Sequence, residues 1–127
     1  DRAYVVSGGG SIKIFDIADR GQPTQVGEIF SKGFSERGTV IDGYIYLADG
    51  VNEKVYIIDR KEMEVLSSFG DGGRQPGQFY GAHSIMTDSH GNIYTTETFE
   101  GKRIQKFVYK GEGAIRAGDQ GVVWPSN

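Results

Sequence analysis

The feature that most constrains the fold is a repeated pair of short strand-like segments. One tyrosine marks each copy, at Tyr4, Tyr46 and Tyr94, so that successive copies stand 42 and 48 residues apart. Around these tyrosines the residue types alternate, as in a strand whose successive side chains point to opposite faces. A second strand-like run follows each tyrosine, at residues 11–16, 54–59 and 102–109.

Turn-forming residues separate these runs. The chain has twenty glycines, many of them in pairs or triplets, and glycine supplies the positive φ angles of tight turns. Seven Tyr and seven Phe, beside abundant Val and Ile, favour strands over helices. Hairpin turns are predicted at residues 8–10, 42–43, 52–53 and 89–92. The sequence therefore predicts an all-β chain of antiparallel meanders.

Short strands repeated with a period in the forties are typical of β-propeller blades. Each blade is a four-stranded antiparallel meander that buries its faces against neighbouring blades. The chain divides into a blade lacking its first strand (1–37), a middle blade (38–70), a third blade (71–113) and a C-terminal tail (114–127). These blades are too few to close a ring. The predicted fold is a single partial β-propeller, open unless other copies complete it.

The third blade resembles an NHL repeat. Residues 70–79 are similar to that family's linker between blades. Residues 83–88, 91–94 and 102–107 then follow in the family's order and spacing, although Ser84 stands where the family usually has Gly. The resemblance implies a propeller blade.

The first blade resembles a different propeller repeat, of the LVIVP type, over residues 3–29. Residues 40–59 are compatible with either family. Both resemblances imply the same fold, and a fold by itself does not determine function.

The NHL resemblance also draws attention to His83. Some NHL-like propellers, notably the peptidyl-hydroxyglycine amidating lyases, hold zinc with histidines at this point of several blades. A catalytic zinc takes about three protein ligands, so several copies would have to bring His83 to one axis. This leaves a metal-dependent lyase or hydrolase, with zinc or calcium, as an alternative to a histidine held by the neighbouring blade. Residues 49–52 and 71–73 lack the ligand pattern of a calcium loop and are predicted to be turns. We expect no cofactor, and we expect any small ligand or peptide near Tyr80 and His83, at the mouth of the channel.

Two further groups of residues suggest chemistry but are not predicted to perform it. His83 and Ser84 are adjacent on a strand, so we expect them on opposite faces and not as a nucleophile–base pair. Glu97 and Glu100, with Lys102 and Arg103, are expected to form a solvated hairpin end of little energetic value. The sequence thus predicts no catalytic constellation within one chain, and an enzyme is the less favoured interpretation.

Charge and composition exclude several partners. The net charge of −3 provides no basic surface for nucleic acid. No run approaches the roughly 18 apolar residues of a membrane helix. The chain has no cysteine, which excludes disulfides and thiolate metal sites, and it begins at Asp1 without a methionine. We expect an extracellular or periplasmic protein.

The incomplete blades suggest how the chain works. A stack of two or three blades leaves apolar sheet faces uncovered at its ends, and the first blade also has an unpaired edge. The simplest partner is another copy bound head to tail, which gives a ring if the rotation closes and a filament if it does not. The expected function is a self-assembling structural polymer or binding scaffold, and the remaining alternative is a part of a longer NHL propeller. The residues expected at the assembly interface are Tyr4, Val5, Val6, Val122, Val123 and Trp124.

Overall fold

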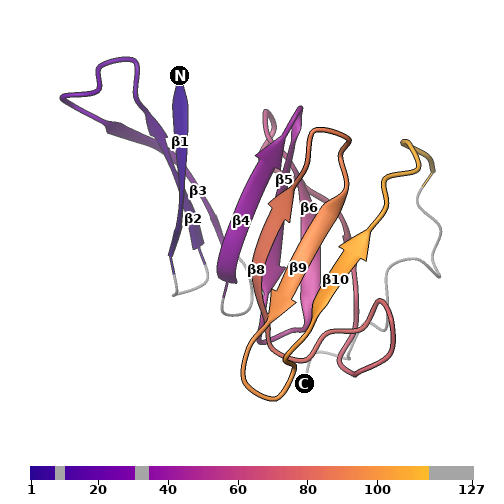
Figure 1. The fold of residues 1–127 in the computed structure, drawn as a ribbon. Coiled ribbons are helices and arrows are strands. Elements are labelled where there is room, and N and C mark those ends of the chain that lie inside the picture. The colour runs from indigo at the N-terminus through magenta and orange to yellow at the C-terminus, as the bar shows by residue number, and fades with distance from the viewer. Residues whose placement is uncertain (8–10, 31–34, 115–127) are drawn as a thin grey trace.

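The computed structural model describes residues 1–7, 11–30 and 35–114. These residues form ten strands in three small antiparallel sheets, none of which is closed (Figure 1). The prediction of an all-β chain is confirmed. Among the described residues, no helix has the length and apolar character needed to cross a membrane.

Each sheet is a simple meander in which strands adjacent in sequence are adjacent in space. The first sheet contains β1 (Arg2–Ser7), β2 (Ser11–Asp16) and β3 (Thr24–Phe30). The middle sheet contains β4 (Ser35–Ile41), β5 (Tyr44–Asp49), β6 (Lys54–Asp59) and β7 (Val65–Phe69). The third sheet contains β8 (Ala82–Thr87), β9 (Ile93–Glu97) and β10 (Ile104–Phe107). The middle sheet begins at Ser35, slightly before the expected position 38.

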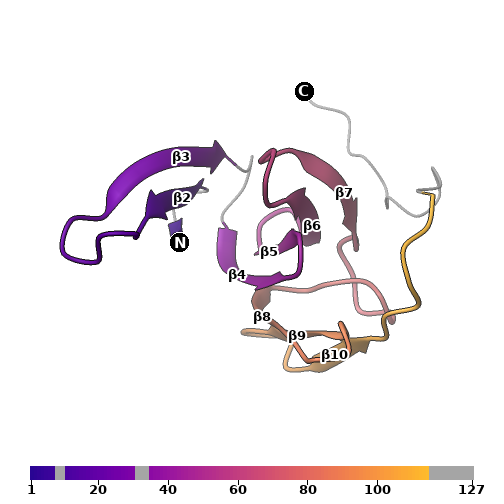
Figure 2. The same ribbon diagram turned by 90° about the horizontal axis from the view of Figure 1, so that it is seen from above.

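The middle sheet is covered on both faces because its strands alternate two sets of apolar side chains. Ile45 and Leu47 of β5 point toward the first sheet and are 1% exposed, packed with Ile12 of β2. Tyr46 and its neighbours on the opposite face pack against β8 and β9 of the third sheet. Figure 2 shows the resulting arrangement, with the middle sheet between the other two.

The middle and third sheets lie closest at their first strands and diverge toward their last ones (Figure 2). Near β4 and β8 the hydroxyls of Thr39 and Thr87 are 3.5 Å apart. Farther out, the gap is filled by the rings of Phe69, Phe79 and Phe107, whose centroids are 5.0–6.2 Å apart. Phe79 precedes β8 and is fully buried, so this linker belongs to the core.

Aspartates fix the turns between strands. The Asp49 carboxylate accepts hydrogen bonds from the backbone N–H groups of Val51 and Asn52. Asp59 and Asp88 bind the turns that follow them in the same way. Asp is favoured at such positions because its carboxylate accepts hydrogen bonds from the backbone N–H groups of the turn.

Candidate functional site

A β-bulge brings His83 and Ser84 together at the start of β8. Ala82 pairs with Glu97 and Ser84 pairs with Thr96, so that His83 is an extra residue in the ladder. A bulge interrupts the alternation of side chains between faces. Nδ1 of His83 therefore lies 3.0 Å from Oγ of Ser84. The expectation that the two side chains point to opposite faces is wrong, because it assumed a regular strand.

The backbone around this pair is held by the middle sheet. The carboxylate of Glu53, in the β5–β6 turn, accepts hydrogen bonds from the N–H groups of Gly81 at 2.8 and 3.0 Å and of Ala82 at 3.3 Å. An acyl-transfer site needs free N–H donors for its oxyanion, and Glu53 already occupies these two. These two N–H groups are therefore used to hold the start of β8 against the middle sheet. Sequence reasoning missed Glu53, since nothing along the chain signals its distant partner.

Tyr80 lies at the same end of β8, and its side chain is 43% exposed. The guanidinium of Arg74 stands over its ring, 4.4 Å from the centroid. Tyr80 and His83, the two residues predicted to share a ligand site, lie just before and at the start of β8. In the described part of the chain, no group of three His, Cys, Asp or Glu residues is placed to hold a metal ion.

The third sheet has an open face, which we define by the outward side chains of its three strands. Strand register aligns Met86 with Tyr94 and Lys106 in one row, and Ser84 with Thr96 and Ile104 in the next. Met86 is 63% exposed and Ile104 is 73% exposed. The Lys106 ammonium lies 5.2 Å from the centre of the Tyr94 ring, and its interaction with Tyr94 raises the pKa of Lys106 above its ordinary value.

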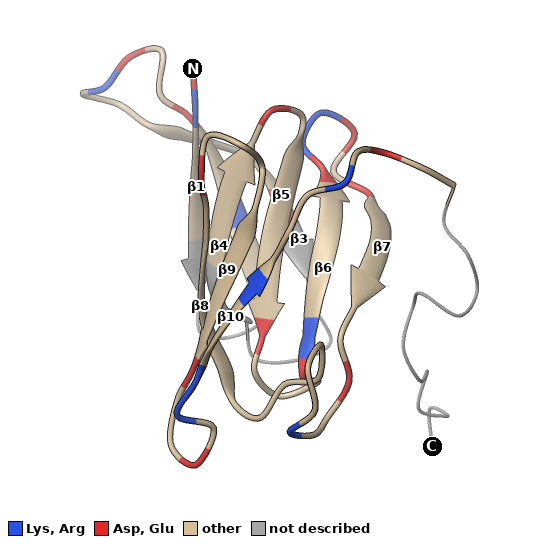
Figure 3. Ribbon diagram, turned by 45° about the vertical axis from the view of Figure 1, so that its right-hand side comes forward, with Lys and Arg blue, Asp and Glu red and all other residues tan. Residues whose placement is uncertain are grey.

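The first sheet also has an open face, on the side away from the middle sheet. Its outward side chains include Val5, Lys13 and Glu28, which are aligned across β1, β2 and β3. Phe15 lies in the neighbouring row. Val5 is 48% exposed. Along the ribbon, most residues coloured as charged lie in turns and at strand ends (Figure 3).

The repeat tyrosines occupy the same face of all three sheets. Tyr4 packs on the middle sheet, where its hydroxyl accepts a hydrogen bond of 2.9 Å from Arg60. Tyr46 is 9% exposed in the core between the middle and third sheets. Tyr94 lies on the open face of the third sheet, with its hydroxyl donating to Asp88. Each sheet therefore presents its tyrosine face toward the next sheet, and the third sheet has no following sheet among the described residues.

Of the residues expected at the assembly interface, the structure describes the side chains of Tyr4 and Val5. Tyr4 packs within the molecule, whereas Val5 is exposed on the open face of the first sheet. Val6 lies in β1, and its side chain is outside the described part of the structure. Val122, Val123 and Trp124 lie outside the described residues.

Glu97 and Arg103 form an ion pair in which Glu97 is buried, so the expectation of a solvated hairpin end is wrong for these two residues. Glu100 and Lys102 are exposed, as expected. The Glu97 side chain is 1% exposed, and its Oε1 lies 2.8 Å from Nη2 of Arg103. The same guanidinium donates to the carbonyls of Gly73, Arg74, Gln75 and Gln78. Arg103 thus fastens the linker before β8 to the β9–β10 hairpin, which charge alternation in the sequence could not reveal.

Comparisons with known proteins identify no relative. The sequence matches no family model, and no curated protein matches it. The resemblance to NHL and LVIVP-type repeats therefore rests on the residues of this chain alone.

Proposed function

We propose that the three sheets are β-propeller blades and that the chain works by binding further copies of itself head to tail, as a non-enzymatic scaffold or polymer. One observation carries the proposal. The middle sheet is covered on both faces, whereas each end sheet has one covered face and one open face with apolar side chains.

The orientation of the tyrosine faces determines which surfaces fit together. Tyr4 faces the middle sheet, and Tyr46 faces the third sheet. A sheet that covers Tyr94 in the same manner must do so with the face that does not carry its own repeat tyrosine. The first sheet of another copy has such a face uncovered, and it bears Val5 and Phe15. The contact joins two different surfaces, so it extends from copy to copy until a ring closes or a filament grows.

The exposed apolar groups on these faces favour association. Burying one Val, Met or Ile side chain contributes about 1.5–3 kcal/mol relative to leaving it exposed. Met86 and Ile104 on one face and Val5 on the other are about half exposed or more. The face of the first sheet carries both Lys13 and Glu28, and the face of the third sheet carries Lys106, so the proposed contact rests on the apolar groups.

Sedimentation velocity across a wide concentration range, with negative-stain microscopy of the same samples, tests this proposal. We expect the mean particle mass to rise with concentration and rings or filaments to appear. Ile104→Glu places a charge on the open face of the third sheet and is expected to leave monomers.

Val51→Glu is the matched control, because Val51 is 65% exposed but lies in the β5–β6 turn, away from both open faces. It is expected to assemble like the unmodified chain. A monodisperse, cooperatively folded monomer at the highest concentration would overturn the proposal. Equal effects of the two substitutions would also overturn the assignment of the interface.

A further inference from the structure

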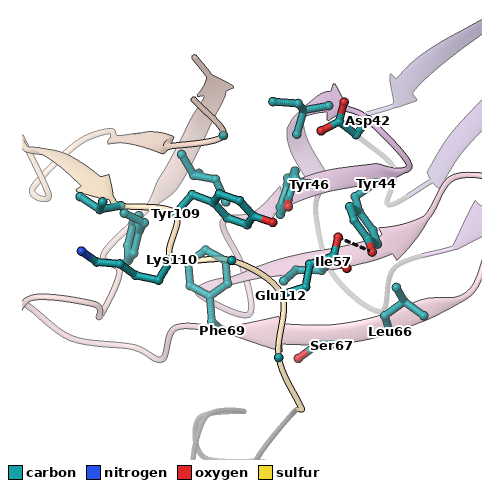
Figure 4. Close-up of a pocket in the computed structure, with 17 residues that line it drawn as sticks. Asp42, Tyr44, Tyr46, Ile57, Leu66, Ser67, Phe69, Tyr109, Lys110 and Glu112 are labelled. Atoms are coloured by element: carbon teal, nitrogen blue, oxygen red, sulfur yellow. Dashed lines mark hydrogen bonds between the residues drawn. The ribbon is translucent and has the colours of Figure 1, made fainter. Parts of the chain in front are cut away.

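A cavity of about 490 Å³ opens between the middle and third sheets, away from both open faces. Its walls come from the β4–β5 turn, from β6 and β7, and from residues 107–113, which follow the third sheet (Figure 4). Small-molecule sites are typically about 300–1,000 Å³ in volume. The cavity therefore has the size of a ligand site.

Aromatic rings form much of the wall. Tyr44, Tyr46, Tyr109 and Phe69 all line the cavity, and the three tyrosines lie on the same side of it (Figure 4). Tyr109 is 49% exposed, so its ring faces solvent as well as the cavity. Rings in such an arrangement attract cations through their negative π faces.

Two acidic residues, Asp42 and Glu112, and one cation, Lys110, are the charged groups that line the cavity. The Tyr44 hydroxyl donates a 3.0 Å hydrogen bond to Oε1 of Glu112, and this bond raises the pKa of Tyr44 above its ordinary value. Burial raises the pKa of Tyr46, and Tyr109, Glu112 and Asp42 raise it further. Two carboxylates, those of Asp42 and Glu112, thus line the cavity together with these tyrosines. The one cationic lining residue, Lys110, directs its ammonium away from the tyrosines (Figure 4).

We propose that this cavity binds an organic cation with an apolar body, such as an aryl or alkyl quaternary ammonium compound. The rings of Tyr44, Tyr46 and Tyr109 lie beside the cationic group on one wall of the cavity, and Glu112 supplies the counter-charge. The apolar walls formed by Ile57, Leu66 and Phe69 hold the hydrocarbon part. Most of the lining is apolar, so a fully hydrated ion such as sodium is not the expected ligand.

Equilibrium dialysis measures this binding independently of the assembly state of the chain. The probe is 4-hydroxyphenyltrimethylammonium, and the control ligand is 4-tert-butylphenol, which has the same shape without the charge. We expect the cation to bind at least about tenfold more tightly, which corresponds to about 1.4 kcal/mol. Added salt is expected to weaken binding of the cation and to leave the neutral compound unaffected.

Three substitutions locate the site. Glu112→Gln keeps the side-chain shape and removes the charge, and Tyr109→Leu removes an exposed ring. Each is expected to weaken cation binding about fivefold to tenfold. Glu100→Gln, in the exposed β9–β10 turn, is the matched control and is expected to bind like the unmodified chain.

Three results would overturn the proposal: equal affinity for the two compounds, absence of binding, or equal effects of Glu112→Gln and Glu100→Gln. Circular dichroism of each variant verifies that the sheets are retained. The dialysis result tests cation binding independently of self-association, because a monomer could bind the cation and a polymer could fail to bind it.

Discussion

The guanidinium of Arg103 lies 2.8 Å from the carboxylate of Glu97, whose side chain is almost completely buried, and the pair joins β9 to the linker that precedes β8. Removing one partner of a buried ion pair leaves the other charge uncompensated. We expect Glu97→Gln to lower the free energy of unfolding by about 3 kcal/mol. Arg103→Lys should also destabilise the chain, because lysine cannot reach several carbonyls with one planar group.

Urea unfolding followed by circular dichroism measures both effects. The control is Glu62→Gln, which breaks an ion pair with Lys61 in which both side chains are largely exposed, at 62% and 90%. It is expected to change the free energy of unfolding by less than about 1 kcal/mol. Similar losses for Glu97→Gln and Glu62→Gln would contradict a structural role for the buried pair.

Gly70 is a position where a side chain cannot be accommodated. Its φ is +94°, and a Cβ atom would lie 2.2 Å from Cε2 of Phe79. Gly70→Ala should therefore lower the free energy of unfolding by about 2 kcal/mol or more, through strain and overpacking. Gly43→Ala is the control, because a Cβ there meets nothing within 4 Å. If thermal melts show the same stability for both variants, the buried position of Phe79 is wrong.

Thr95 carries a buried hydroxyl that has no hydrogen-bond partner among the described residues. A hydroxyl without a partner is costly to bury. Thr95→Val should therefore leave the stability unchanged or raise it by about 1 kcal/mol. Thr96→Val, in the adjacent position on the open face, should have no such effect on unfolding of the monomer. A loss of stability in Thr95→Val would show that the hydroxyl has a partner in the folded chain.

Asp88 makes the free energy of unfolding depend on pH in the acidic range. The hydrogen bond from the Asn92 side chain, with others from backbone N–H groups and from Tyr94, lowers its pKa from 3.8 to about 2. Because the folded pKa is depressed, the stabilisation is complete above about pH 4 and is lost as the pH falls toward 2.

Asp88→Asn removes the titrating group, so its deficit in stability should be constant above about pH 4 and should shrink below it. Urea midpoints of both chains across this range give the comparison. A deficit independent of pH would mean that Asp88 acts only through the shape of its turn.

The sequence predicted the strands better than it predicted the sites. Period-two alternation identifies the strands around Tyr46 and Tyr94, since the two faces of a strand differ in burial. The His83 bulge was missed because a regular strand was assumed, although the buried residues Ala82 and Ile85 are three positions apart, a spacing that a regular strand does not place on one face. The Glu97–Arg103 pair was missed because burial of a charge depends on a distant segment, here the linker near Gln78. The aromatic cavity was missed for the same reason, since Tyr44 and Glu112 lie far apart in the sequence and meet only in the folded chain.

Cross-linking of two single-cysteine variants tests the central claim, head-to-tail binding of sheet faces, most directly. The chain has no cysteine of its own, so Val5→Cys in β1 reports on the open face of the first sheet and Met86→Cys in β8 on that of the third, each in the first described strand of its sheet, where facing sheets lie closest. We predict that mixing the two variants under mild oxidation yields mixed dimers faster than either variant forms dimers alone. Equal rates for mixed and unmixed samples, or dimers that form only within one variant, would contradict head-to-tail assembly.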